Sequence, residues 1–290
     1  MPNIQAFRGL RYNLGHVGEL EAVLAPAPGL IAADVQADLY KKHPCNFVRV
    51  NCNRVEPGDA AGDRLERAAR YFRNWQREGV FERDGEAAIY VIQVAEENGG
   101  TLPSMGFISI AGIDSLTPAN QDPPDESAIE SELDLIKRCE ANLNPVTVLL
   151  EDLDAKIESL LTAQVANKAP VQAEANGLKF KLWIENDLHF ISSLSALAAS
   201  VEHRAIANLA SLAAAEEYKK CRPDSSNDVV PQSDSVLSCS ICVSGLRLTE
   251  ILDQASTKGP RNTSPTSIEF ADGLIRIPLI LSGMVVNVFD

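Results

Sequence analysis

The sequence has little positive charge and few histidines. Lysine and arginine number 26 of the 290 residues, against 40 aspartates and glutamates, which gives a formal net charge of −14 at pH 7. A chain with this balance repels phosphate polymers and anionic membranes on average. We therefore expect neither a nucleic-acid polymer nor a membrane among its partners. The histidines, which number 4, show no spacing typical of a metal cluster, so no metal site is predicted.

Long apolar runs are missing as well. The most apolar segment, Ile275 to Phe289, is interrupted by Arg276, Pro278 and Asn287 and is shorter than the ~20 residues that a membrane-spanning helix needs. The opening residues, MPNIQAFR, show no basic flank followed by an apolar stretch, which a secretory signal would have. We expect a soluble, cytoplasmic protein.

Several catalytic motifs are absent from the sequence. It contains no glycine pattern of the Rossmann or phosphate-loop type, and Gly99-Gly100 lies in a predicted hairpin rather than between a strand and a helix. No Gly-x-Ser-x-Gly elbow occurs, so a Ser-His-Asp hydrolase is poorly supported.

The cysteines number 6 and are dispersed through a chain that is large enough to fold without disulfides, so we expect reduced thiols. The one close pair is Cys239 and Cys242, in the run Val236–Ser244 that predicts a strand. Residues three apart in a strand point to opposite faces, which disfavours a shared metal ion. We interpret both as small apolar core residues.

With 45% apolar and 23% charged residues, the composition is that of an ordinary globular protein. Strand and helix patterns are mixed rather than regularly alternating, and Ala88–Ala95 with Met105–Ile113 reads as a hairpin. This predicts an α+β protein with mixed, mainly antiparallel sheets and packed helices. We expect two lobes, residues 1–115 and 116–290, with a mobile linker near 222–235.

The periodicity predicts the individual elements. Helices are expected at Ala33–Lys42, Ala60–Glu78, Ser127–Ala141, Asp154–Ala163, Asp187–Ala199 and His203–Lys220. Strands are expected at Ile4–Leu10, Asn46–Asn51, Val146–Leu150 and Leu178–Ile184, besides the hairpin and Val236–Ser244.

Several short words resemble a known family. They are FRGLRYN at Phe7–Asn13, VLAP at Val23–Pro26 and NFVRV at Asn46–Val50. The sequence is similar here to the prokaryotic family known as domain of unknown function 1015, whose members read F-R-G-L-R-Y-N, V-A-P-P-Y-D-V-I and Y-N-V-V-R-L. The resemblance is specific over the first 113 residues or so and continues more weakly to about residue 220.

The chain departs from that family at its charged positions. Family members carry D-G-H-H-R-Y at the opening of a helix, and Ser200–Ala205 is aligned with it here, which keeps only His203 and Arg204. The segment Leu24–Ile31 has lost the family's aspartate, and Ala119 and Asn120 replace charged residues after Pro118. These departures suggest a diverged paralogue.

The D-G-H-H-R element is similar to a helix-opening signature of the ParB and sulfiredoxin superfamily, which cradles nucleotide phosphates and includes free-serine kinases. The resemblance implies that family members with the intact signature bind ATP or ADP with Mg²⁺, and that the second lobe is ParB/sulfiredoxin-like.

On this resemblance we predict a site around Arg204. In the first turn of a helix its guanidinium could bind a phosphate together with the helix N-terminus, with Arg8 and Arg11 converging from the neighbouring lobe. Glu202 or His203 could orient a nucleophile. The alternative is structural: Glu202 favours the helix dipole, Arg204 is solvated, and Arg8 and Arg11 pair with carboxylates.

Three functions remain open. The first is a family member with weak or lost catalysis that binds a nucleotide or a phosphorylated small molecule. The second is an active ATP- or ADP-dependent kinase of a small hydroxylated metabolite. The third is a structural or regulatory protein without a ligand.

Overall fold

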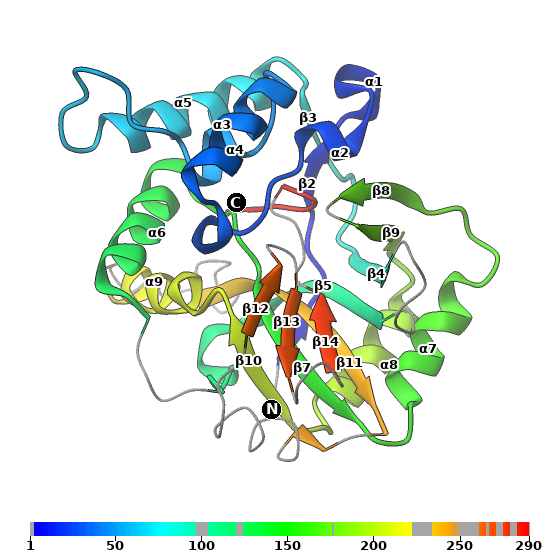
Figure 1. The fold of residues 1–290 in the computed structure, drawn as a ribbon. Helices are drawn as coiled ribbons and strands as arrows, with labels where there is room; N and C mark the ends of the chain where they lie inside the picture. The colour runs from blue at the N-terminus through cyan, green and yellow to red at the C-terminus, as the bar shows by residue number, and fades with distance from the viewer. Residues whose placement is uncertain are drawn as a thin grey trace.

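A mixed sheet of eight strands runs through the protein in the computed structural model, and helices lie around it (Figure 1). The structure describes residues 3–96, 104–119, 124–175, 177–221, 234–245, 247–248, 261–264, 267–270, 275–278 and 283–289. The strand order is β10-β7-β11-β5-β4-β9-β8, with β1 also paired to β5. Within this sheet, the pair of β11 with β7 is parallel and the other pairs are antiparallel.

The strands of this sheet are β1 Ile4–Gln5, β4 Ile89–Glu96, β5 Ser104–Gly112, β7 Val146–Asp152, β8 Val171–Ala175, β9 Leu178–Glu185, β10 His203–Ala207 and β11 Ser235–Ser244. Smaller sheets pair β2 Leu10–Tyr12 with β3 Phe81–Arg83, β6 Ala141–Asn142 with β15 Asn287–Val288, and β12 Arg261–Ser264, β13 Ser267–Phe270 and β14 Ile275–Pro278 with one another.

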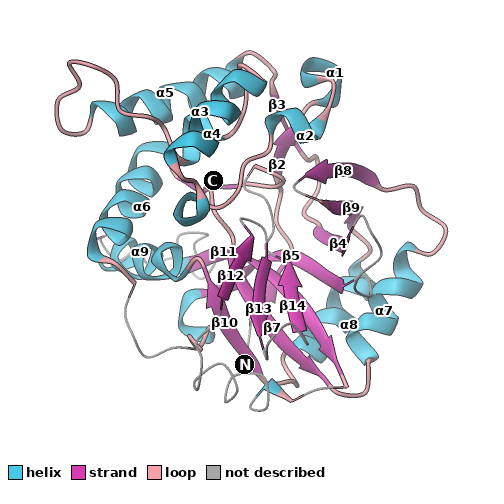
Figure 2. Cartoon of the chain, in the orientation of Figure 1, coloured by secondary structure: helices cyan, strands magenta, loops and turns pink. Residues whose placement is uncertain are grey.

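The helices are α1 Leu14–Val17, α2 Leu20–Val23, α3 Ala33–Lys42, α4 Val48–Asn51, α5 Asp63–Arg77, α6 Glu126–Cys139, α7 Lys156–Val165, α8 Leu188–Ala198 and α9 Leu209–Lys220, with 3₁₀ turns η1 Pro28–Leu30 and η2 Ile113–Ser115. In Figure 2 the helices lie outside the main sheet, with α3, α4 and α5 beyond one end and α7 with α8 together at one side. This arrangement confirms the predicted α+β class.

Alternation along the strands separates two apolar cores. On β4, Tyr90 and Ile92 belong to the core that includes Phe72 and Trp75 of α5, whereas Ile89 and Val91 belong to the core that includes α7 and α8. Successive strand residues point to opposite faces. The hairpin of β4 and β5 is therefore confirmed both by its pairing and by the burial of its two faces.

Strand β11 lies between β5 and β7 and joins the two halves of the chain. The sheet consequently takes strands from both sides of the predicted lobe boundary near residue 115, and that boundary stays a prediction. Residues 222–233 of the expected linker lie outside the described residues.

The expected strand at Asn46–Asn51 is wrong, because this segment forms a turn followed by α4. The buried side chain of Asn46 accepts a hydrogen bond from the backbone N–H of Val48 and donates to the carbonyl groups of Ala22 and Leu24. An asparagine that bonds to nearby backbone in this way competes with a strand ladder.

The expected helix at His203–Lys220 is wrong in its first third. His203–Ala207 forms the edge strand β10, paired with β7, and α9 begins only after Asn208. Ala205 also exchanges backbone hydrogen bonds with Thr117 and Ala119. These non-local bonds fix an extended backbone that the local pattern did not reveal. Within the described residues, none of the helices has the length and apolar character needed to cross a bilayer.

Candidate functional site

Arg8 and Arg11 lie at β2 and bind one aspartate. Arg11 makes a two-pronged ion pair with Asp84, with Nη2 2.6 Å from Oδ1 and Nε 3.0 Å from Oδ2. The Nε of Arg8 donates to the backbone carbonyl of Asp84 at 3.0 Å. Arg11 is mostly buried, so its guanidinium is committed to this contact.

Tyr90 completes the same arrangement. Its hydroxyl donates to Asp84 Oδ2 at 2.6 Å and accepts the backbone N–H of Gly9 at 2.7 Å. Burial, followed by the hydrogen bond to Asp84, raises the pKa of Tyr90. A β-carbon at position 9 would collide with the Tyr90 hydroxyl. The FRGLRYN word thus takes part in a part-buried contact around Asp84.

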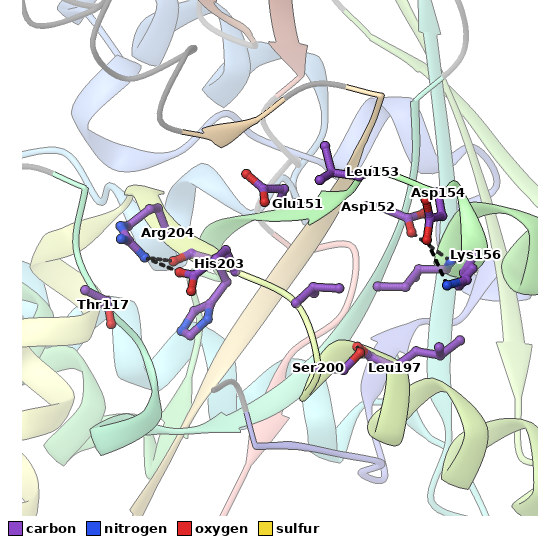
Figure 3. A pocket seen from close by; sticks show the side chains of 13 residues that line it. Thr117, Glu151, Asp152, Leu153, Asp154, Lys156, Leu197, Ser200, His203 and Arg204 are labelled. Carbon is purple, nitrogen blue, oxygen red and sulfur yellow. Dashed lines mark hydrogen bonds and ion pairs between the residues drawn. The ribbon is translucent and has the colours of Figure 1, made fainter.

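Glu202, His203 and Arg204 lie elsewhere, in a pocket of about 470 Å³ at the ends of β7 and β10 (Figure 3). We call it the acidic pocket; its lining is Thr117, Glu151, Asp152, Leu153, Asp154, Lys156, Ile157, Leu197, Ser200, Val201, Glu202, His203 and Arg204. Neither Arg8 nor Arg11 lines it. The structure therefore does not bring the three predicted arginines together.

Arg204 and His203 are held by protein groups within this pocket. Arg204 Nη1 lies 2.6 Å from the carbonyl of His203 and 3.3 Å from Glu202 Oε2. His203 is buried, and its Nε2 lies 2.8 Å from the carbonyl of Ser115. Burial lowers the pKa of His203, so the neutral ring donates this hydrogen bond at neutral pH. These contacts tie β10 to η2.

The carboxylates of the acidic pocket also have structural partners. Asp152 accepts the N–H groups of Ile157 and Glu158 and caps α7, and Asp154 pairs with Lys156. Glu151 Oε2 accepts the N–H of Leu248. Four carboxylates stand against two cations in this lining, a balance that disfavours an anion.

A second cavity, of about 630 Å³, lies where α4, α5, α6 and the start of α9 meet. We call it the amide cavity. It is lined by Pro28, Gly29, Val50, Asn51, Cys52, Asn53, Arg64, Leu65, Pro124, Ser127, Ala128, Ser131, Glu132, Leu135 and Ile206–Ser211. Its volume is in the range typical of small-molecule sites.

Amide and guanidinium groups provide most of its polar character. Asn51, which is 4% exposed, donates from Nδ2 to the carbonyl of Pro26, while its Oδ1 has no hydrogen-bond partner among the residues that the structure describes. Arg64 is partly buried and its Nη2 lies 3.3 Å from Ser131 Oγ. An unpaired buried acceptor is uncommon in folded proteins. The Oδ1 atom of Asn51 is itself closed off from solvent, so it offers no hydrogen-bonding position to a ligand in this cavity.

Glu132 is the buried acid of the amide cavity. Its Oε1 accepts from Asn144 Nδ2 at 2.8 Å and its Oε2 lies 3.2 Å from Ser211 Oγ. Burial raises the pKa of Glu132 to about 7, although both hydrogen bonds act in the opposite direction. At this pKa the protonated and ionised forms of Glu132 are both populated near neutral pH.

The start of α9 forms the opposite wall. Asn208 adopts a left-handed conformation with φ 56°, and its side chain donates to the carbonyl of Pro145 rather than capping the helix. The first N–H groups of a helix lack intrahelical acceptors and carry a partial positive charge. The side chain of Asn208 does not cap this turn, and the N–H of Ser211 donates to the Asn208 carbonyl at 3.0 Å. Leu209 and Ala210 also line the cavity, and among the described residues their N–H groups are the ones through which this turn can contribute to anion binding.

Comparison with known proteins identifies the family of the chain. The sequence profile described as “Protein of unknown function (DUF1015)” matches residues 4–208, more than half of the chain. The chain belongs to this family. No curated protein and no solved structure matches it. The DUF1015 match ends at Asn208, directly before α9, and the similarity to the ParB and sulfiredoxin superfamily stays a prediction.

The family words converge on the amide cavity. In this DUF1015 protein, Pro28 and Gly29 come from the word that resembles V-A-P-P-Y-D-V-I, and Val50 ends the word NFVRV. The residues that open α9, Ala207 to Ser211, contain no histidine, arginine or aspartate. The charged residue types of the family's helix-opening signature are therefore absent from this turn, and His203 and Arg204 lie on strand β10 rather than at a helix start.

Magnesium with a nucleoside triphosphate fits this lining poorly. Among the described lining residues there is one guanidinium, of Arg64, and one carboxyl group, of Glu132, which already has two hydrogen-bond partners. Magnesium in phosphate sites is usually held by one or two carboxylates, with several cationic groups around the phosphates. The donor set suits one phosphate-sized anion.

Sequence reasoning missed Asn51, Arg64 and Glu132. Arg64 lies in the predicted helix Ala60–Glu78, which carries several other arginines, and Glu132 lies in the predicted helix Ser127–Ala141 among other acidic residues. The available signal was the pair of family words at Leu24–Ile31 and Asn46–Val50, which border the cavity.

Proposed function

We propose that this DUF1015 protein binds a small molecule through one phosphate-type anionic group in the amide cavity, and that it does not transfer phosphoryl groups. The ligand class is a nucleoside monophosphate or another singly phosphorylated metabolite. The observation that carries the proposal is that Arg64 and the uncapped start of α9 line the same cavity.

Local charge supports this choice of cavity. A guanidinium and a helix N-terminus both favour an anion, and each gains strength away from bulk water. The acidic pocket has the opposite balance, and its Arg204 is already bonded to Glu202 and to the His203 carbonyl. The hydroxyl group of Ser131, beside Arg64, also lines this cavity and suits the polar remainder of a small metabolite.

The donor set argues against catalysis. Phosphoryl transfer needs charge neutralisation around the phosphate and a group that positions the nucleophile. The described part of the chain contains no cluster of three or more metal-binding side chains, and the only carboxyl group among the lining residues is buried and hydrogen-bonded. Binding without transfer needs only the anion site.

Thermal-shift and calorimetric titrations test the proposal. AMP, ADP, ATP and pyrophosphate are compared with adenosine, which has the base and sugar of AMP without the phosphate. AMP should raise the melting temperature by mass action and adenosine should not. Arg64→Gln should weaken AMP binding roughly 10- to 100-fold, the loss of one charge-assisted hydrogen bond.

Arg204→Gln is the matched control, because it removes the same charge from the acidic pocket. It should leave AMP binding unchanged. Loss of binding in Arg204→Gln with retention in Arg64→Gln would move the site to the acidic pocket, and no shift with any phosphorylated ligand would contradict the proposal. Formation of ADP from ATP with a hydroxylated acceptor, abolished by Arg64→Gln, would contradict its non-catalytic part.

A further inference from the structure

Two buried side chains in the amide cavity can share a proton. Glu132 is on α6 and Ser211 is in the first turn of α9, and Glu132 Oε2 lies 3.2 Å from Ser211 Oγ. We propose that anion binding in the amide cavity takes up one proton, which is held by the Glu132–Ser211 pair. This inference rests on the proposed function, and it adds the proton as a second ligand of the same site.

The direction of the hydrogen bond changes with the charge of Glu132. An ionised carboxylate can only accept, so the Ser211 hydroxyl must donate to it, and its proton is then directed to Glu132 rather than offered to a ligand. The protonated acid can donate from Oε2 to Ser211 Oγ. The hydroxyl proton of Ser211 is then released for a ligand, beside the N–H groups of the α9 first turn.

Protonation also removes a negative charge from the cavity. One proton from solvent forms one O–H bond on Glu132, and no other bond is made or broken. Both residues line the cavity and are at most 9% exposed, so little water separates them from a bound anion. The negative charge of ionised Glu132 would therefore repel that anion strongly, and protonation removes the repulsion. The neutral pair therefore favours the anion twice, by a gained donor and by a lost repulsion.

Among the described groups around Glu132, none takes up the proton in its place near neutral pH. Asn144 faces it from the loop before β7, Ser211 from α9, Cys52 from the end of α4, and Cys139 from α6 itself. Arg64 of α5 lines the same cavity but binds Ser131, and the ion pairs found among the described residues include none to Glu132.

The burial of Glu132 places its pKa at about 7, so both protonation states are populated near neutral pH. The two cysteine thiols have pKa values raised by burial and stay neutral in this range.

Sulfate is the probe, because its charge does not change between about pH 5.5 and 8.5, whereas phosphate titrates in this range. The dissociation constant for sulfate should rise with pH above about 7, approaching tenfold per pH unit, as linkage to one proton requires. Calorimetry at pH 8 in two buffers of different ionisation enthalpy should show uptake approaching one proton per bound sulfate.

Glu132→Gln separates this proposal from a general pH effect. Its side-chain amide can donate to Ser211 Oγ as the acid does, so sulfate affinity should be independent of pH and close to that of the wild type at pH 6. Glu185→Gln is the control, because Glu185 is also buried but pairs with Lys168 and lies outside the cavity. It should keep the wild-type pH dependence.

A ligand-free measurement tests the same proton. The pKa of Glu132 is raised from 4.5 in the folded protein, so its contribution to stability is fully present below about pH 4.5 and is lost as the pH rises through about 7. The melting temperature of the wild type should fall relative to that of Glu132→Gln across this window.

If Glu132→Gln folds poorly, Ser211→Ala provides the binding test. This variant removes the hydroxyl donor, so it should weaken sulfate binding at pH 6.

Three results would overturn the proposal: equal sulfate affinity of the wild type at pH 6 and 8, an unchanged pH dependence in Glu132→Gln, or no sulfate binding at either pH. The proposed function is judged separately, by AMP binding and its loss in Arg64→Gln. Binding of AMP that is insensitive to Glu132→Gln at pH 8 would refute proton uptake and leave the anion site in place.

Discussion

At the scale of residues, Asp84 joins three side chains from two other segments of the chain. It binds the guanidinium of Arg11, the hydroxyl of Tyr90 and, through its carbonyl, the side chain of Arg8. A part-buried carboxylate that is satisfied from several directions fixes the positions of all its partners. The guanidinium of Arg11 is therefore held by Asp84, and the exposed Arg8 contacts the backbone carbonyl of that residue.

Removing the Tyr90 hydroxyl tests this contact around Asp84. Tyr90→Phe leaves the N–H of Gly9 and one oxygen of Asp84 without their buried partner, so the free energy of unfolding should fall by about 1–3 kcal/mol. Urea denaturation followed by circular dichroism measures it. Tyr71→Phe, at a partly buried position on α5, is the control and should change stability by less; equal losses in both variants would show that the contact around Asp84 contributes little.

At the scale of elements, left-handed residues at two helix ends set where β10 stops and α9 begins, and where α6 stops. Asn208 and Glu140 both adopt left-handed backbone conformations, with φ 56° and 50°, at the start of α9 and the end of α6. The left-handed conformation costs free energy in residues that have a β-carbon, and asparagine adopts it at a lower cost than most. The turn at Asn208 separates β10 from α9, and for that reason Arg204 and the helix start belong to different cavities.

Glu140 offers a direct measure of such strain. It is exposed and ends α6, with its N–H bonded to the Ile136 carbonyl, so Glu140→Gly should stabilise the protein by about 0.5–1 kcal/mol. Chemical denaturation measures the change. Glu140→Ala, which also removes the charge but keeps the β-carbon, should give no comparable gain, and equal stabilisation by both variants would attribute the effect to charge.

At the scale of the whole molecule, the sheet is completed by a strand from beyond the DUF1015 match. Strand β11 pairs with β5 on one side and β7 on the other, whereas the family match ends at residue 208. The close approach of β5 and β11 requires a glycine at position 106, because a β-carbon there would collide with the Ser240 carbonyl of β11.

Gly106→Ala should therefore destabilise the whole fold, by about 3 kcal/mol or more, because backbone on a central strand must move. Urea denaturation and the yield of folded protein measure the effect. Gly112→Ala is the matched control on the same strand: its β-carbon would have no neighbour closer than 3.6 Å, and its effect should be small. Similar losses in the two variants would refute the role of the β5–β11 approach.

Local chemistry in the sequence predicted most elements of this protein. The helix at Ala33–Lys42 and the hairpin of β4 and β5 follow from periodicity and turn residues, and Cys239 and Cys242 do face opposite cores. The family words also predicted membership correctly. Each of these signals lies within a short stretch of chain, where side-chain spacing alone fixes which face is buried.

Only the tertiary structure decided which charged groups are free to bind something. His203–Ala207 is a strand because it pairs with β7 at the edge of the sheet. Arg11 forms an ion pair with Asp84. Glu132 is buried beside Ser211 because α6 packs against α9. Partners such as Asp84 for Arg11 are 73 residues away along the chain. The energy of a charge depends on its burial and on its nearest opposite charge, and both are set by contacts that no local pattern contains.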